Sequence, residues 1–246
     1  MLTVSTSGGS KVALVTGSAR GLGLAVARHL RARGERVHVT WRSEGEQARA
    51  LRDEFGARAH RADLCVPRDA EELLRAVLEQ DGRLDHAVHA VGEYVSGSLA
   101  TTTLADLRRM LASNTESAFV FFTAVREALR ASRGQAVFFG TSGLAGFRAR
   151  RSTAAYAAAK SALLVLVRSW ALEEAPHGVT VNLVSPGHVP HAHAHADTLD
   201  ESRLAAIPLG RAGTPEDVAR AVAFLCSEEA GYTTGTELLV SGGWFL

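Results

Sequence analysis

The sequence predicts an α/β protein with a Rossmann-like, doubly wound parallel sheet of about seven strands and helices on both faces. Short β-branched segments alternate along the chain with longer segments of helical periodicity, and this alternation is typical of a parallel sheet covered by helices. Several of the strand segments are apolar at consecutive positions, as strands buried on both faces require.

The predicted elements follow one another in regular order from the first strand to the last. The chain has no Pro/Ser-rich linker, internal repeat or low-complexity segment, so residues 1–246 are predicted to form a single domain. An irregular segment at 188–207 is predicted to be a substrate lid. The predicted strands are Val12–Thr16, Arg36–Trp41, Arg58–Arg61, His86–Val91, Ala136–Phe139, Thr180–Val184 and Glu237–Val240, and the predicted helices are Leu22–Arg33, Glu44–Phe55, Asp69–Glu79, Leu104–Arg130, Thr153–Ala175 and Pro215–Cys226.

Composition excludes several classes of function. The formal net charge of +1 argues against nucleic acid as the main partner. No apolar segment reaches the roughly 20 residues of a membrane span, and the polar N-terminal residues do not resemble a signal peptide. We therefore expect a cytoplasmic protein. Its two cysteines, Cys65 and Cys226, lie far apart in the sequence and are predicted to be reduced and structural.

A glycine-rich turn follows the first predicted strand and opens a predicted helix. Its glycines, Gly17, Gly21 and Gly23, have the spacing Gly-x-x-x-Gly-x-Gly. Glycines allow the backbone to turn tightly and to approach a pyrophosphate, while the helix N-terminus offers free N–H groups and the positive end of a dipole. Because glycine spacing alone is weak evidence, the strand before the turn and the helix after it carry the inference.

Tyr156 and Lys160 lie four residues apart near the start of a long predicted helix, so their side chains share one face. A free phenol has a pKa of about 10, too high for efficient acid–base chemistry at neutral pH. A nearby ammonium favours the phenolate and lowers that pKa. The pair therefore predicts a proton donor and acceptor for a carbonyl oxygen.

The glycine spacing and the Tyr156-Ala-Ala-Ala-Lys160 motif resemble the short-chain dehydrogenase/reductase family, over residues 11–243, and most closely the branch of bacterial 3-oxoacyl-carrier-protein reductases. The resemblance implies that Lys160 also holds the nicotinamide ribose, and that Asn114 holds a water linking this lysine to solvent. Relatives are mostly tetramers, so a homotetramer or homodimer is expected. The implied cofactor contacts are Gly17, Ser18, Arg20, Gly21, Leu22, Gly23, Arg42, Asp63, Leu64, Ala90, Gly92, Tyr156, Lys160, Pro186, Gly187 and Val189.

The end of the second predicted strand favours NADP(H) over NAD(H). A carboxylate at this position would bind the ribose 2′-hydroxyl of NAD and repel a 2′-phosphate, but the first acid after the strand is Glu44. Arg42 at the strand end and Arg20 before the second glycine carry guanidinium groups that suit phosphate oxygens.

Two positions depart from the family pattern. His89-Ala90-Val91-Gly92 stands where the family has Asn-Asn-Ala-Gly, which removes two amide side chains that brace the sheet near the ribose. The family serine that binds the substrate carbonyl corresponds to Thr141, Ser142 or Gly143, according to the reference point used for counting. Ser142 is chosen because it is a hydroxyl in the middle of this window, and Thr141 offers the same chemistry.

Four histidines, at 188, 191, 193 and 195, lie in the predicted lid. Alternating histidines suit metal binding, but beyond Asp197 no companion carboxylate or cysteine motif accompanies them, so no metal is predicted. A polar lid is expected instead. Farther along, Thr214 and Pro215 have the residue types of an N-cap and a first helical position.

The sequence as a whole predicts an NADPH-dependent carbonyl reductase, or the reverse alcohol dehydrogenase, with Asn114, Ser142, Tyr156 and Lys160 as its catalytic residues. The expected partner is a small carbonyl or alcohol substrate, by resemblance a 3-oxoacyl thioester. Leu172 stands where such reductases carry an arginine thought to dock the carrier protein, so a polyketide-type ketone or a pterin remains an alternative. From another class, the alternative is a non-catalytic dinucleotide-binding sensor or scaffold.

Overall fold

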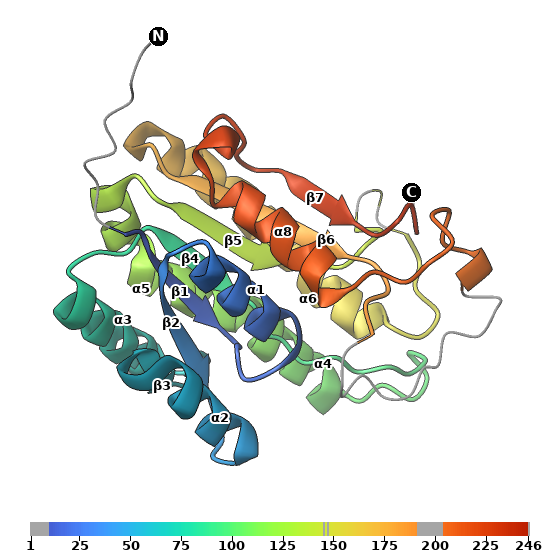
Figure 1. The fold of residues 1–246 in the computed structure, drawn as a ribbon. Coiled ribbons are helices and arrows are strands. Elements are labelled where there is room, and N and C mark those ends of the chain that lie inside the picture. The colour runs from blue at the N-terminus through green and yellow to red at the C-terminus, as the bar shows by residue number, and fades with distance from the viewer. Residues whose placement is uncertain (1–9, 145, 147, 191–203, 246) are drawn as a thin grey trace, which may run out of the picture.

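The computed structural model describes residues 10–144, 146, 148–190 and 204–245. Seven strands form one parallel sheet in the order β3-β2-β1-β4-β5-β6-β7 (Figure 1). The strands are β1 (Val12–Thr16), β2 (Arg36–Trp41), β3 (Ala59–Arg61), β4 (His86–His89), β5 (Gln135–Phe139), β6 (Thr180–Pro186) and β7 (Glu237–Val240). The predicted fold class is thereby confirmed, with strand ends displaced by a residue or two.

Helices connect the strands and cover both faces of the sheet (Figure 1). Thr214 caps α8 through a reciprocal capping box with Asp217, and Pro215 occupies its first turn, as the sequence predicts. The helices are α1 (Gly21–Ala32), α2 (Glu46–Phe55), α3 (Pro67–Asp81), α4 (Leu104–Leu111), α5 (Ser117–Ser132), α6 (Ala154–Glu174) and α8 (Pro215–Leu225), with short 3₁₀ turns at Gly56–Arg58, Ala175–His177 and Glu228–Ala230.

The core consists of two apolar layers separated by the sheet. Successive strand side chains point to opposite faces, so Val12 and Leu14 of β1 pack in the layer beneath α3, α5 and α6. Ala13 and Val15 pack in the other layer, beneath α1, α2 and α8. All four side chains are at most 1% exposed, which explains why β1 is apolar at every core-facing position.

The sheet changes direction of winding between β1 and β4, and a dinucleotide crevice forms at such a point in doubly wound folds. The strand ends are in register here, with Thr16 opposite His89. The pairing continues beyond β4, because Ala90 N–H donates to the Thr16 carbonyl at 3.1 Å. The carboxyl ends of β1 and β4 therefore form the floor on which the candidate site is built.

The predicted single helix Leu104–Arg130 is wrong in one respect. A π-helical segment, Ala112–Glu116, interrupts it and separates α4 from α5. Asn114 causes the interruption locally, since its Nδ2 donates to the Met110 carbonyl at 3.0 Å and so competes with the backbone ladder. The extra residue in this turn places Asn114 inside the protein, where it is fully buried.

Helix α6 with the turn that follows it, Ala154–His177, is long and apolar enough to span a membrane by length and composition alone. This is weak evidence for a span, because the core helix of a soluble protein has the same composition. One side of α6 packs into the core through Leu163, Val167 and Trp170, and the same helix carries the buried Lys160.

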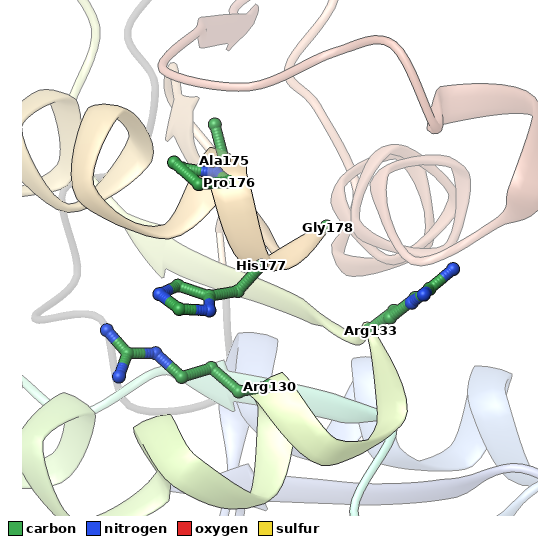
Figure 2. A pocket seen from close by; sticks show the side chains of 6 residues that line it. All are labelled: Arg130, Arg133, Ala175, Pro176, His177 and Gly178. Carbon is green, nitrogen blue, oxygen red and sulfur yellow. The ribbon is translucent and has the colours of Figure 1, made fainter.

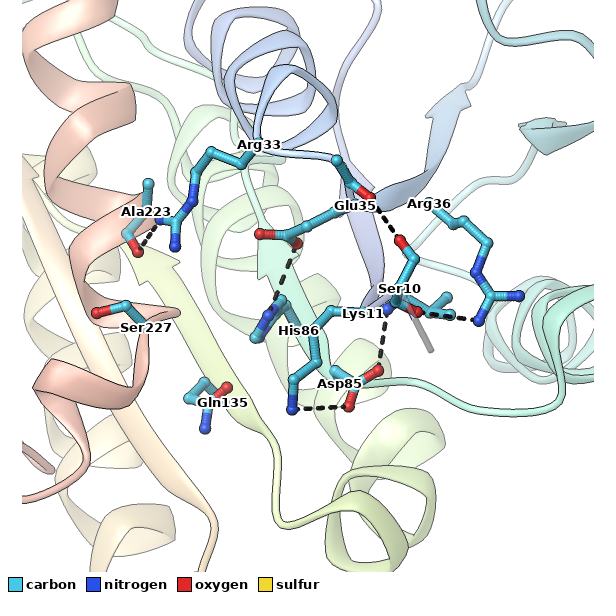
Figure 3. A network of polar contacts seen from close by, with 12 residues as sticks. Ser10, Lys11, Arg33, Glu35, Arg36, Asp85, His86, Gln135, Ala223 and Ser227 are labelled. Carbon is cyan, nitrogen blue, oxygen red and sulfur yellow. Dashed lines mark hydrogen bonds and ion pairs between the residues drawn. The ribbon is translucent and has the colours of Figure 1, made fainter. Parts of the chain in front are cut away.

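A buried polar network lies at the amino ends of β1 and β4, opposite the crevice (Figure 3). Asp85 accepts from Val12 N–H at 2.9 Å and pairs with Lys11 and Arg83. Beside it, the Glu35 carboxylate lies 3.6 Å from His86 Nε2. Burial raises the pKa of Glu35 to about 7 and lowers that of His86 to about 4. The Glu35 carboxyl therefore ionises near neutral pH, beside an imidazole that is already neutral there.

Glu35→Gln is expected to stabilise the protein at pH 8 and to have little effect at pH 5. The Glu35 pKa is about 7 when folded and lies near its usual value when unfolded, so burying the carboxylate destabilises the fold increasingly as pH rises from about 4.5 through 7. Thermal and urea unfolding at the two pH values should show a gain of roughly 1–2 kcal/mol at pH 8 only. Glu79→Gln, at an exposed helical position, is the control. Equal destabilisation at both pH values would contradict the argument.

Candidate active site

The glycine turn after β1 is held in place by its contacts with β2 and β4. Gly17 has φ +68°, and a Cβ on it would lie 2.6 Å from the Ala90 carbonyl oxygen. A Cβ on Gly23 would lie 2.4 Å from the Gly17 carbonyl oxygen. Thr40 of β2 accepts from Gly17 N–H at 3.1 Å, and its own N–H donates to Ser18 Oγ at 3.1 Å. Only glycine fits at these two positions.

The N-terminus of α1 has the properties of an anion site. Arg20 precedes the helix in extended conformation, without a side-chain cap, and the first turn contains no acidic residue. The first N–H groups of the helix therefore lack an intrahelical acceptor and add to the positive end of the dipole. By contrast, α4 and α8 begin with capping boxes that occupy these donors. The turn and this helix start fit the pyrophosphate of a dinucleotide.

The other expected cofactor contacts also lie along the carboxyl edge of the sheet. Arg42 directly follows β2, with 58% of its side chain exposed. Asp63 follows β3, and its Oδ1 accepts from Cys65 N–H at 3.0 Å. The next residue, Leu64, is buried, as is Val189 after β6. Of the two predicted structural cysteines, Cys226 is buried but Cys65 is exposed.

β6 ends at Pro186, and Gly187 follows it beside the end of β7. Gly187 N–H donates to the Val240 carbonyl at 2.9 Å. A Cβ on Gly187 would lie 2.7 Å from Ser241 Cα, so the chain must pass here without a side chain. The family resemblance assigns the backbone at Pro186 and Gly187 to the nicotinamide, and pairing with β7 holds this backbone in place.

Lys160 is buried at the meeting point of β4, β5 and α6. Its side chain emerges from α6, and Nζ donates to the Phe139 carbonyl at 2.7 Å. A Cβ on Gly92 would lie 3.3 Å from this Nζ and 2.4 Å from Asn114 Oδ1. Asn114 Nδ2 is already used, by the Glu93 and Met110 carbonyls, whereas the buried Oδ1 has no hydrogen-bond donor among the described residues. Lys160, Asn114 and Gly92 thus lie close together.

Tyr156 is half-buried one helical turn before Lys160. The Lys160 Nζ lies 5.7 Å from the centre of the phenol ring. Burial raises the pKa of Tyr156 above its usual value, and burial lowers the pKa of Lys160 to about 7. The expected lowering of the Tyr156 pKa by Lys160 is therefore not found in the protein alone, because burial penalises both charged forms. Tyr156 keeps its proton, which is the form that donates to an oxyanion.

Both main-chain polar groups of Ser142 are hydrogen-bonded. Its N–H donates to the Pro186 carbonyl at 3.0 Å, and its carbonyl accepts from Arg150 Nη2 at 2.7 Å. Arg150 also bonds the Gly143 carbonyl and lies 4.7 Å above the ring of Phe245. Ser142 is buried, 1% exposed, next to the end of β6, whereas Gly143 adopts φ +75°. These contacts fix the main chain at Ser142 and Gly143, and the choice of Ser142 over Thr141 stays a prediction.

His89 takes over the bracing that the missing amides would give. Its Nδ1 lies 2.9 Å from Thr16 Oγ1, and its Nε2 lies 3.1 Å from Ser117 Oγ. Because Ser117 donates its proton to the Ser113 carbonyl, His89 must donate through Nε2 and accept from Thr16. Burial lowers the pKa of His89 to about 3, so the ring stays neutral. One imidazole thus ties β1 to α5.

Three residues near the site have no counterpart in the sequence prediction. Tyr94 packs edge-on against Tyr156 with ring centres 5.1 Å apart. Arg150 binds the turn that carries Ser142. Glu93 lies 3.5 Å from Arg42. All three come from loops after β4 or β5, where residue type and spacing give no periodic signal.

The predicted lid lies largely outside the described residues, since 191–203 are not among them. His188 and Val189 at its beginning are described, and the His188 carbonyl accepts from Gly213 N–H at 3.0 Å. Three of its four histidines, His191, His193 and His195, fall in the part that is not described. Among the described residues, no group of three potential metal ligands occurs.

Two cavities in the described part of the chain differ in their relation to the site: the first lies at the opposite edge of the sheet and the second lies close to Tyr156. One of about 530 Å³ lies at the amino ends of β5 and β6, lined by Arg130, Arg133, Ala175, Pro176, His177 and Gly178 (Figure 2). Arg130 there forms a bidentate pair with the buried Glu174, which offsets its charge. The other cavity, of about 340 Å³, is apolar and lies between α4 and α6 near Tyr156.

Comparisons with known proteins find relatives over almost the whole chain. A family described as enoyl-(acyl carrier protein) reductase matches residues 17–245. The 3-oxoacyl-[acyl-carrier-protein] reductase FabG of Escherichia coli (strain K12) is 36% identical, over 96% of this chain and 98% of its own length. The acetoacetyl-CoA reductase of Rhizobium meliloti (strain 1021) is 30% identical, with coverage of 96% and 99%. A blue fluorescent protein from a metagenomic library, solved in complex with NADPH, has a TM-score of 0.85, 33% identity and coverage of 96% and 98%.

His89→Leu is expected to lower the free energy of unfolding by roughly 1–3 kcal/mol, because the substitution removes two buried hydrogen bonds and leaves the hydroxyls of Thr16 and Ser117 with only their bonds to the Val88 and Ser113 carbonyls. His89→Asn keeps a donor and an acceptor and should lose less. Urea unfolding of the two variants measures the difference. A leucine variant as stable as the parent would show that the imidazole contributes packing alone.

Proposed function

The chain belongs to the short-chain dehydrogenase/reductase family, and from this premise we propose that it is an NADPH-dependent carbonyl reductase, able to run in reverse as an alcohol dehydrogenase. The observation that carries the proposal is the convergence of Lys160, Asn114 and Tyr156 at the carboxyl ends of β4 and β5, directly beside the glycine turn. A bound nicotinamide would supply the hydride for the carbonyl carbon.

The residues present fit NADP(H). The turn at Gly17 and the uncapped start of α1 would hold the pyrophosphate. Arg20 and Arg42, both exposed, would bind the 2′-phosphate, while Asp63 and Leu64 would contact the adenine and Ala90 and Gly92 the ribose. The NADPH complex of a 33% identical structural neighbour supports this choice of cofactor.

The four residues of the site then divide the reaction between them. Tyr156, whose burial keeps the phenol protonated, donates that proton to the oxygen of the reduced carbonyl. Lys160 orients the ribose hydroxyls and resupplies the proton, which its pKa of about 7 permits at neutral pH. Ser142 Oγ holds the carbonyl oxygen. Asn114 Oδ1, buried and facing Lys160, connects the lysine to solvent through water.

A 3-oxoacyl thioester or a related ketone is the proposed substrate. The apolar cavity between α4 and α6 supports a substrate with an apolar chain over a pterin. Leu107 lines this cavity and packs in the same small cluster as Tyr156. Turnover of acetoacetyl thioester, set against small ketones and dihydropterins, distinguishes these substrates. Leu172, 80% exposed on α6, offers no charge to a carrier protein, so the free thioester is the form to test.

The exposed outer surface of α5 and α6 supports the proposal of a homodimer or homotetramer. Phe119, Val165 and Leu172 are 51%, 58% and 80% exposed, and they lie on two neighbouring helices. Side chains of this size in one surface region are typical of a protein interface. We further propose a cytoplasmic location, without nucleic acid or membrane partners.

The second candidate is a dinucleotide-binding sensor without catalysis. It is favoured by the end of β4, where His89 stands in place of the amide residue of the family pattern. The buried Lys160 argues against it. Placing an amine inside the protein destabilises the fold, and a sensor gains nothing from it.

Tyr156→Phe is expected to reduce NADPH oxidation with a ketone substrate by at least about a thousandfold, because the proton donor is lost. NADPH affinity, measured by calorimetry, should change less than about threefold, since the aromatic ring remains. Tyr232→Phe, at a fully exposed position, is the matched control. Full activity in the Tyr156 variant would overturn the assignment, whereas loss of NADPH binding would mean that the hydroxyl acts in holding the cofactor rather than in proton transfer.

A further inference from the structure

Glu93 follows the end of β4, and its backbone is fixed by the π-helical segment. Its N–H donates to Ser113 Oγ at 3.3 Å, and its carbonyl accepts from Asn114 Nδ2 at 2.9 Å. Both partners are buried. The side chain therefore extends from a rigid base, even though Glu93 lies in a loop.

The Glu93 carboxylate lies between two arginines. Oε1 is 3.5 Å from Arg42 Nη2, and Oε2 is 3.5 Å from Arg109 Nε. Arg109 comes from α4 and also pairs with Asp106 at 3.0 Å, so it has a second anionic partner. For Arg42, Glu93 is the acidic partner within the described part of the chain.

The contact between Glu93 and Arg42 crosses the dinucleotide crevice. Arg42 follows β2 and Glu93 follows β4, and β1 lies between these two strands. The glycine turn begins at Gly17, directly after β1. A side-chain pair that joins the ends of β2 and β4 must therefore pass over the carboxyl end of β1, where a dinucleotide lies in this fold.

We propose that Glu93 is a cofactor-discriminating residue, whose carboxylate competes with the 2′-phosphate of NADPH for Arg42 and so reduces the preference for NADPH over NADH. This inference rests on the proposed function, since it assumes that the crevice holds a nicotinamide dinucleotide.

Charge explains the direction of the effect. A 2′-phosphate brings close to two negative charges toward Arg42, where it meets a carboxylate already in contact with that guanidinium. A 2′-hydroxyl instead donates a hydrogen bond to the carboxylate, and the ion pair between Arg42 and Glu93 stays intact. Glu93 therefore penalises NADPH and not NADH. Arg20 has no ion pair with an acid in the described chain and still attracts the phosphate.

Exposure sets the size of the effect. The side chains of Arg42 and Glu93 are 58% and 39% exposed, so water screens their interaction strongly. A single exposed pair of this kind changes an equilibrium by a factor of a few, which is large enough to alter cofactor choice without abolishing binding of either dinucleotide.

The test measures the dissociation constants of NADPH and NADH by titration calorimetry for the parent and for Glu93→Gln. The Gln variant should bind NADPH about three- to tenfold more tightly, with NADH unchanged or slightly weaker. Glu93→Ala should act in the same direction. Glu44→Gln is the matched control, because it removes a carboxylate two residues beyond Arg42 that pairs instead with Arg52. That control should leave the NADPH:NADH ratio unchanged.

Two further measurements make the proposal falsifiable. In an Arg42→Gln background, Glu93→Gln should no longer alter NADPH affinity, since the competition requires the guanidinium. Raising salt from 0.05 to 0.5 M should shrink the effect. An equal change for both dinucleotides, or the same change in Glu44→Gln, would overturn the role of Glu93. A parent protein that binds neither dinucleotide would instead refute the proposed function.

Discussion

Lys160 carries its amino group into the protein interior, where the carbonyl of Phe139 accepts from it at 2.7 Å. A buried amine destabilises the fold unless polar groups surround it. The carboxyl edge of the sheet is arranged to supply them. The last residue of β5, Phe139, directs its carbonyl toward Lys160 Nζ. The segment after β4 has Gly92 next to the lysine, where a Cβ would touch both Nζ and Asn114. The π-helical turn places Asn114 inside the protein. Three chain segments are thus specified by one side chain.

His89 shows how this edge tolerates an exchanged residue. The family pattern has an amide at this position, and here the imidazole uses one donor and one acceptor to connect Thr16 with Ser117. The hydrogen bonds continue through Ser117 to the Ser113 carbonyl, beside Asn114. The glycine turn that receives a cofactor is therefore connected to the segment that supports the catalytic lysine, without any charge, since burial keeps His89 neutral.

The sequence was sufficient for the parts of the structure that depend on local pattern. The two-residue alternation of β1 and the four-residue spacing of Tyr156 and Lys160 predict which face each side chain occupies. The π-helical turn was not predictable, because one added residue leaves an apolar helix periodic on both sides. The roles of His89 and Arg150 depend on partners far along the chain or on the path of a loop, which only the folded backbone determines.

Arg42 illustrates why residue type alone does not establish a binding role. The chain carries cations mainly as arginine, so an arginine after β2 could equally be an ordinary surface residue. The contact with Glu93 orients the Arg42 side chain across the crevice before any ligand binds. A 2′-phosphate that binds this guanidinium must share it with the Glu93 carboxylate, whereas a 2′-hydroxyl need not. The role of Arg42 in distinguishing the two dinucleotides therefore depends on the carboxylate that faces it as much as on its own charge.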